Sequence, residues 1–583
     1  MTTPEEQLQI VGKKIIEAEE RVSKAKEDLR KLQSQHNSLI PICRLPNEVL
    51  SLIFTSCVTD AHGVFKSWMF DSKVYSTRFS WIWVTHVCRH WREVALSCPE
   101  MWATPVFQKP NLAREMLVRA KGAPLRIHAL NFSTRKDQEE VLKEAIKDMA
   151  RIAELHFVVA GLSEETRSLL SRPAPLLRSL EVISGPSTNE VQLPDNFLAG
   201  DMPLLRELTL RQCLLCLDKI DPSNLRSLCL HGNDHFKQPR FKNLLEVLQT
   251  MQSLEHLELS ESAWTGEIVT LDTTVALPRL ESVKIRAAIP TCVSILDCTD
   301  IPSQATVHVM GNAVSSCDFK VALPCLTRLI KKITGDTKAI SLQTVAEHGP
   351  FELKIFDQDL PDDPHYTSTP VPRLHFQYPR STVPTVRDLF RQTLEMLPLV
   401  QLIAIHLDVC DMISASEYIE HFGSLAALHT ISIDGACAYT FLQAFRQTVP
   451  HVADSPVTDS SGVQSNEAQI SFPSLKRIVF WNVNFEEPPE LFDELLEELH
   501  DRSEKGAPIQ EIGVREGIHF SEDHERELRE IVEVVDWDGY HNEYDEEEEN
   551  EDEEDEDEVY HWPDYDSDYG GVFDDDDDFY LYF

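Results

Sequence analysis

The sequence predicts a chain of mixed α+β and α/β-repeat class. It combines an N-terminal heptad helix, a small helical block, a long irregular solenoid of short strands, and a disordered acidic tail. Three patterns support this prediction: a seven-residue apolar repeat, a recurring Leu-x-x-Leu-x-Leu motif, and a block of acidic residues. They divide the 583 residues at 1–40, 41–106, 107–520 and 521–583.

Residues 8–39 carry the heptad pattern. Position a holds Leu8, Ile15, Val22 and Leu29, and position d holds Val11, Ala18, Ala25, Leu32 and Leu39. In a parallel dimer, Lys14 would attract Glu19, but Arg21 would repel Lys26. Two interpretations therefore remain open: a weakly specified homodimer through residues 8–39, and one helix of about 48 Å that packs back on its own domain.

A compact helical block follows Pro41, because proline ends the heptad helix. Pro46 suits a first helical turn, and Glu48 favours its positive end. Helical spacing then predicts two apolar stripes, one of Val49, Leu50, Ile53, Phe54 and Cys57, the other of Val84, Val87, Cys88, Trp91, Val94 and Ala95. Met101-Trp102 follows as an apolar plug.

This block resembles an F-box of the kind common in fungal proteins. The resemblance is carried by Ile-Cys-Arg-Leu-Pro-Asn-Glu-Val-Leu at 42–50, Val-Cys-Arg-His-Trp-Arg-Glu-Val-Ala at 87–95, and the closing Met101-Trp102. It covers about 60 residues, and the segment between its halves, 59–80, is longer than a minimal F-box needs.

The resemblance implies a non-catalytic substrate receptor of an SCF-type (Skp, cullin, F-box) ubiquitin ligase, which supplies proximity while a recruited enzyme transfers ubiquitin. It would dock on a Skp-type adaptor and, through it, on a cullin. The implied adaptor-binding residues are Leu45, Pro46, Val49, Leu50, Ile53, Phe54, Val87, Cys88, Trp91, Val94 and Ala95. Among these we expect Trp91 to belong to the core, and Leu45 and Pro46 to be the main contacts.

From residue 150, a six-residue apolar pattern recurs at intervals typical of leucine-rich repeats. Its ten copies start at Ile152, Leu177, Leu205, Leu225, Leu254, Leu280, Leu402, Leu428, Leu475 and Ile509. Each copy predicts one short strand. Residues 290–400 fit the period poorly, and 451–470 reads as a polar insertion.

If these strands line a concave face, the residues between the leucines point toward a target protein. The candidate target-binding residues are Glu207, Thr209, Arg211, Ser227, His231, His256, Glu258, Lys284 and Arg286. Their charges are mixed and do not identify a ligand. A solvated sheet surface, with binding at a loop or terminus, is equally compatible with the pattern.

The net charge of −43 is concentrated in the tail. Residues 536–583 hold 24 acidic and no basic side chains, which leaves 73 acidic against 54 basic residues elsewhere. This balance argues against nucleic-acid binding. Seven tyrosines interleaved with the tail acids permit an alternative function, a non-catalytic scaffold that binds basic proteins independently of a cullin.

The sequence gives little support for a membrane, secreted, catalytic or metal-binding protein. We find no apolar run long enough to cross a membrane and no secretory signal pattern, and 13 scattered cysteines favour reduced thiols in the cytoplasm or nucleus. No catalytic or cofactor-binding motif is found. Cys213 and Cys216 lack a second pair for zinc, and His86 with His90 lack a third ligand. His231 and His235 fit a repeat turn better than a ligand pair, so we expect no metal.

Overall fold

The computed structural model of the protein describes residues 4–63, 80–129, 136–158, 163–183, 196–212, 223–232, 241–260, 264, 274–311, 327–333, 337–344, 351–360, 371–378, 386–397, 399–409, 413–435, 437–449 and 469–540. The Cys213/Cys216 pair, His235, most of the 451–470 insertion and tail residues 541–583 lie outside these ranges. No helix in these ranges is long and apolar enough to span a bilayer.

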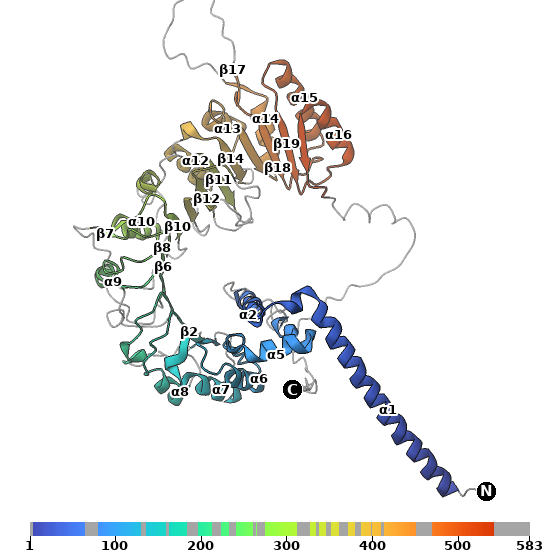
Figure 1. The fold of residues 1–583 in the computed structure, drawn as a ribbon. Helices are drawn as coiled ribbons and strands as arrows, with labels where there is room; N and C mark the ends of the chain where they lie inside the picture. Colours follow the sequence, from blue (N-terminus) through green and yellow to red (C-terminus); the bar gives the residue numbers. More distant parts are fainter. Residues whose placement is uncertain are drawn as a thin grey trace, which may run out of the picture.

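The heptad segment forms one helix, α1 (Pro4–Leu39). It ends just before Pro41, as predicted, and projects away from the rest of the chain (Figure 1). The large apolar residues of its seam are more than half exposed, from 53% at Ile15 to 79% at Leu8. The interpretation in which this helix packs back on its own domain is therefore wrong, because no described residue covers the face that would make that contact.

The helical block consists of short helices packed around large aromatic side chains. Its elements are η1 (Pro41–Arg44), α2 (Asn47–Gly63), η3 (Ser80–Trp83), α4 (Val84–Val87), α5 (Arg89–Ser97) and η4 (Pro99–Trp102). Phe54 lies 5.0 Å from Trp91, and Trp81 meets Trp102 edge-on at 5.4 Å, both measured between ring centroids. Trp102 also donates its indole N–H to the carbonyl of Ala95 at 2.9 Å. The predicted Met101-Trp102 plug is thus buried.

A single sheet of 16 strands extends along the chain from Leu125 to Trp537. Its strands, in spatial order, are β1 (Leu125–Ala129), β2 (Ile152–Val158), β3 (Ser179–Ile183), β4 (Glu207–Arg211), β5 (Ser227–His231), β6 (His256–Ser260), β8 (Ser282–Ala287), β10 (Thr306–Gly311), β13 (Leu374–Tyr378), β12 (Phe351–Phe356), β11 (Ala339–Thr344), β14 (Ala404–Asp408), β15 (Thr430–Asp434), β18 (Arg477–Trp481), β19 (Glu511–Arg515) and β20 (Val534–Trp537). Two small pairs, β7 (Val275–Ala276) with β9 (Thr299–Asp300) and β16 (Thr448–Val449) with β17 (Gln469–Ile470), lie apart. All ten predicted strand segments belong to the large sheet.

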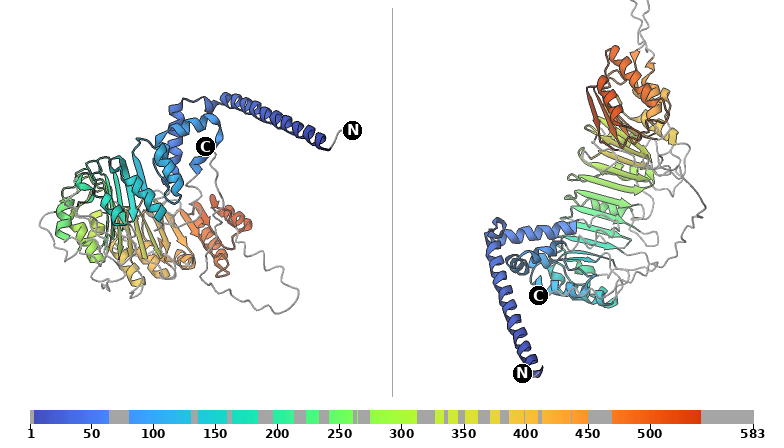
Figure 2. Two further views of the ribbon diagram at one scale, coloured as in Figure 1. Left: turned by 90° about the horizontal axis from the view of Figure 1, so that it is seen from below. Right: turned by 90° about the vertical axis from the view of Figure 1, so that its right-hand side faces the viewer.

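The sheet bends into an arc, with strands on the inner side and helices on the outer side (Figures 1 and 2). The outer helices are α6 (Pro110–Arg119), α7 (Lys136–Ile146), α8 (Glu164–Leu169), α9 (Phe241–Leu248), α10 (Ile289–Asp297), α12 (Val386–Met396), α13 (Ala415–Phe422), α14 (Cys437–Phe445), α15 (Leu491–Glu504) and α16 (Glu522–Ile531), with the short turns η5 (Met149–Arg151), η6 (Phe197–Gly200) and η9 (Leu399–Gln401). Strand side chains alternate, so that Leu208 and Leu210 enter the core while Thr209 faces the inner side.

The poor fit of residues 290–400 to the repeat has a topological cause. β12 runs antiparallel to both β11 and β13, whereas the other neighbours in the large sheet are parallel. The strand order also reverses here, since β13 follows β10 in space and β11 precedes β14. Every residue of β11 is buried, so it lacks the alternation of a half-exposed strand.

The helical block and the sheet share one core. The backbone N–H of Arg126, in β1, donates to the carbonyl of Ala103 at 2.8 Å, and the Arg119 guanidinium lies 4.5 Å above the Trp102 ring. One continuous cluster of buried apolar side chains runs from Leu50 to Val535. The predicted boundary at 106/107 therefore falls inside packed structure, and the block covers the first edge of the sheet.

The prediction of a disordered tail from residue 521 is wrong for its first twenty residues. Residues 522–531 form α16, and β20 adds a sixteenth strand beside β19. Leu528, Val532 and Val535 supply the buried apolar side chains that stabilise this unit. The acidic residues around them are placed on exposed positions and do not prevent folding.

Candidate interaction surfaces

The outward face of α2 carries apolar side chains that no described residue covers. Leu52 is 72% exposed, and Val49 and Ile53 are 39% and 38% exposed. Their i, i+3, i+4 spacing places them on one helix face. Further exposed apolar residues stand on the neighbouring short elements, at Ile42 in η1, Trp83 in η3 and Val87 in α4. These six residues are called the apolar surface below.

Four of the predicted adaptor-binding residues do not reach the surface. Leu50, Phe54, Val94 and Ala95 are at most 3% exposed and form the core between α2 and α5. They are corrected to structural residues, because a partner cannot contact them while the block is folded. Trp91, expected in the core, is half-buried against Phe54.

The remaining predicted contacts are accessible to different degrees. Pro46 is exposed, and Leu45 is half-buried against the core. The predicted continuous stripe from Val84 to Ala95 is broken at Cys88, whose extended backbone (φ −156°, ψ 169°) separates α4 from α5. The Cys88 thiol accepts the Trp91 backbone N–H at 3.4 Å and so caps α5. This break turns Val87 outward, to 56% exposure.

Sequence reasoning did not assign Ile42, Leu52 or Trp83 to the adaptor surface. The signal at Leu52 was available, since it stands three residues after Val49 and one before Ile53. Where apolar residues occupy much of a helix's circumference, their spacing alone does not show which of them pack into the core of the block and which face outward.

The inner face of the sheet brings the predicted target-binding residues together. Strand register arranges these residues in three rows across the strands. The first row holds Glu207, Ser227 and His256. The second holds Thr209, Glu258 and Lys284, and the third holds Arg211, His231 and Arg286. All nine predicted residues therefore lie on one face, across β4, β5, β6 and β8. The prediction that they share a face is confirmed.

The second of these rows crosses the whole sheet and is called the middle row. It consists of His128, His156, Glu181, Thr209, Cys229, Glu258, Lys284, His308, His375, Lys354, Ser341, His406, Ser432, Val479, Gly513 and Asp536. The row is partly exposed over much of its first half, but Ser341 and His406 are fully buried. The accessible part of the face therefore belongs mainly to the earlier strands.

Charged side chains on the accessible part are already paired with one another. The Arg211 guanidinium lies 3.6 Å from the Glu181 carboxylate and 3.3 Å from Nδ1 of His231. Nε2 of His231 lies 2.7 Å from Glu258, and Nζ of Lys284 lies 3.6 Å from the same carboxylate. The mixed charge that the sequence predicts is thus arranged as a chain of alternating partners.

Histidines of the middle row stack in two pairs. The rings of His128 and His156 are 4.7 Å apart and nearly parallel, and those of His308 and His375 are 4.1 Å apart. A carboxylate supports each pair, because Glu154 lies 3.1 Å from His128 and Glu352 lies 3.0 Å from His375. Sequence analysis did not assign these histidines to the face. A signal was available for His156 and His406, which stand between the last two apolar residues of their six-residue motifs, whereas β1, β10 and β13 carry no such motif.

These surroundings shift several pKa values. Burial, followed by the neighbouring His375 and Lys284, lowers the pKa of His308 to about 4. The hydrogen bond from His231, aided by Lys284, lowers the pKa of Glu258 to about 2 against the opposing effect of burial. Burial, with a contribution from Glu258, raises the pKa of the Cys229 thiol to about 12. At neutral pH the row therefore holds a neutral histidine, a carboxylate and a protonated thiol.

Cys229, His231 and Glu258 bring three metal-ligand types within 4.8 Å of one another, a grouping the sequence did not predict. Several contacts compete with metal binding there. Arg211 and Lys284 place two cations beside the cluster, and a thiol with a pKa near 12 is a poor ligand. Arg211 also donates toward Nδ1 of His231, which leaves Nε2 protonated and directed at Glu258.

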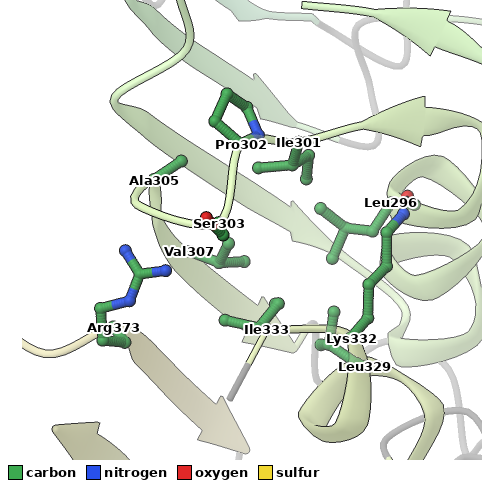
Figure 3. A pocket seen from close by; sticks show the side chains of 10 residues that line it. All are labelled: Leu296, Ile301, Pro302, Ser303, Ala305, Val307, Leu329, Lys332, Ile333 and Arg373. Atoms are coloured by element: carbon green, nitrogen blue, oxygen red, sulfur yellow. Dashed lines mark hydrogen bonds between the residues drawn. The ribbon is translucent and has the colours of Figure 1, made fainter. Parts of the chain in front are cut away.

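A small hollow beside β9 and β10 offers few polar groups (Figure 3). Its lining is mostly aliphatic, with Leu296, Ile301 and Val307 among the residues drawn. Nζ of Lys332 donates to the carbonyls of Leu296 and Thr299 at 2.6 and 2.8 Å. That amine is committed to the fold, so the hollow does not resemble an active site.

Comparison with known proteins adds no assignment: no protein-family model matches the chain, and no curated protein matches it in sequence.

Proposed function

We propose that this chain is the substrate receptor of an SCF-type ubiquitin ligase, with the helical block as an F-box that docks on a Skp-type adaptor and the sheet as an irregular leucine-rich-repeat solenoid that binds a target protein. The exposure of Val49, Leu52 and Ile53 on α2, directly after the F-box-like Leu45-Pro46, is the observation that carries the proposal. The chain itself performs no chemistry in this role.

The apolar surface suits a stable protein partner. Fully burying a side chain such as Leu52 contributes on the order of 1.5–3 kcal/mol, and several of its residues are open. Exposed apolar groups gathered on one small module are typical of interaction sites. The block also packs into the same core as β1, so a partner bound to α2 would be held in a fixed relation to the arc.

The inner face suits the second part of the role. Parallel strands with short returns place polar side chains in rows along a curved surface, the arrangement that repeat proteins use for protein ligands. A target would have to match the alternating charges of Glu181, Arg211, Glu258 and Lys284. Selectivity would arise from that match, since an unmatched partner would leave charges desolvated.

Retention of a Skp-type adaptor by the full chain tests the proposal. Leu52→Lys with Ile53→Lys places two charges on the apolar surface without disturbing buried residues, and should abolish adaptor retention. Val400→Lys is the matched control, because Val400 is 83% exposed in η9, which stands between α12 and β14, and this variant should retain the adaptor.

Two outcomes would overturn the proposal. One is a parent chain that retains no adaptor, and the other is a double variant that retains it as well as the parent while both remain folded. Salt-sensitive capture of a basic protein that depends on residues 541–583, without any adaptor, would instead support the scaffold function.

A further inference from the structure

The seam of α1 is an apolar helix face that no described residue covers. Its open side chains are Leu8, Val11, Ile15, Val22, Leu29, Leu32 and Leu39, exposed by 53–79%. They repeat every seven residues over the length of the helix, which is the pattern of a surface that pairs with another helix. The helix projects from the body, and only its C-terminal end adjoins the helical block (Figure 2).

We propose that α1 pairs with α1 of a second copy of this chain, in an antiparallel coiled coil. A heptad seam fits a helix with the same repeat, and the antiparallel direction follows from two properties of this sequence. One is the placement of its alanines, and the other is the charge at its flanking positions.

The alanines favour the antiparallel direction. In a parallel dimer Ala18 and Ala25 would each meet their own copy, giving two layers that bury little area. With the helices reversed and Val22 set opposite Ala25, each alanine meets a larger side chain. The layers become Leu8 with Leu39, Val11 with His36, Ile15 with Leu32, Ala18 with Leu29, and Val22 with Ala25. Pairing large with small side chains fills layers evenly.

The flanking charges favour the same direction. In the antiparallel register, Arg21 faces Asp28 of the second copy and Glu19 faces Lys26, and symmetry repeats each attraction. In the parallel register, Lys14 attracts Glu19, but Arg21 repels Lys26 twice. The reversed arrangement therefore has only attractive or neutral pairs at these positions.

The antiparallel arrangement also separates the two bodies. The 36 residues of α1 span about 54 Å at the rise of an α-helix, so the two sheets would stand at opposite ends of a rod. A parallel pair would bring both bodies to the same end.

Charge reversal at Arg21 tests the direction, because its effect has opposite signs in the two arrangements. Arg21→Glu faces Asp28 in the antiparallel dimer and should weaken dimerisation of the full chain about 10-fold. In a parallel dimer it would face Lys26 and strengthen association. Adding Asp28→Arg should restore the antiparallel dimer.

Lys13→Glu makes the same change of charge on the outer side of α1, where Lys13 is 81% exposed, and should leave the dimer constant within about 2-fold. Sedimentation equilibrium of the full-length protein measures these constants. A parent chain that stays monomeric at tens of micromolar overturns the proposal, as does an increase in affinity with Arg21→Glu.

Cysteine cross-linking provides a second measurement. The sequence has no cysteine before Cys43, so substitutions in α1 can be followed by comparison with the parent. A mixture of Ala18→Cys and Leu29→Cys chains should form a disulfide between the two variants. Ala18→Cys alone should form none at that position, because eleven residues separate the sulfurs by about 16 Å. A disulfide in the Ala18→Cys sample alone overturns the antiparallel arrangement.

Discussion

Leu52 and Ile53 stand on the surface of α2 without a partner among the described residues, whereas His231, Glu258 and Lys284 on the inner face of the sheet already pair with one another. The two proposed partner surfaces therefore start from different states. Burial of the apolar surface only removes water from side chains. Binding to the inner face must replace existing hydrogen bonds and ion pairs with new ones of similar strength.

This difference suits a division of roles. An apolar surface can bind one constant partner tightly, because hydrophobic burial is non-directional. A face of paired charges gains little net free energy from a partner but discriminates strongly between partners. Under the proposed function, affinity for the adaptor would therefore reside in the helical block and selectivity for the target on the arc.

The largest effect should separate buried from exposed residues within α2. Phe54 is fully buried beside Trp91, so Phe54→Ala should lower the free energy of unfolding by about 3–5 kcal/mol. Leu52→Ala should change it by less than about 0.5 kcal/mol, yet weaken adaptor retention. Denaturant unfolding and adaptor co-purification of both variants measure the contrast. Equal destabilisation by the two would show that Leu52 also belongs to the core.

A smaller effect should appear at His308, on the inner face. Its pKa of about 4 lies below the unfolded value near 6.5, so the unfolded chain takes up this proton more readily. Stability should therefore be lost as the pH falls from about 6.5 to 4, by up to about 3 kcal/mol from this residue. His308→Gln should remove that part of the loss.

Urea unfolding at pH 7, 5 and 4 measures the difference between parent and variant. His86→Gln is the matched control, since the His86 ring lies on the exposed side of α4, and its curve should follow that of the parent. Parallel pH curves for the parent and His308→Gln would contradict the prediction.

The smallest effect is expected at Glu258. Glu258→Gln removes the charge that holds His231 and Lys284, which at this partly exposed site should cost about 1 kcal/mol at pH 7. The folded pKa of about 2 lies below the ordinary 4.5, so this stability is present above pH 4.5 and lost as the pH falls toward 2. The unfolding free energies of parent and variant should therefore differ at pH 7 and approach each other at pH 3. A constant difference would locate the effect in packing instead.

Periodicity predicted the regular parts of the molecule well. Each of the ten six-residue motifs is a strand, because the two apolar positions flanking an inward residue define both the strand and its buried face. The same spacing identified Glu207, Glu258 and Lys284 as neighbours on one surface. Such local signals needed no knowledge of distant contacts.

Other features depended on contacts that no local pattern contains. The apolar positions of α2 extend around much of the helix, and only the docking of α5 decides that Phe54 is buried while Ile53 is not. The acidic residues of 521–540 masked the apolar Leu528, Val532 and Val535, so the last helix and strand were missed. β12 pairs antiparallel with β11 and with β13. A repeat in which every strand runs in the same direction does not predict such a strand.

The two ends of the sheet also bear on how the protein avoids self-association through its strands. An open edge strand can recruit strands from other molecules and start aggregation. The helical block covers the β1 edge through the Arg126 to Ala103 hydrogen bond. At the other end, β20 has four residues and carries Asp536, with Glu533 and Asp538 beside it. A short strand surrounded by carboxylates is a poor template, so growth of the sheet from one molecule into the next is discouraged at both ends.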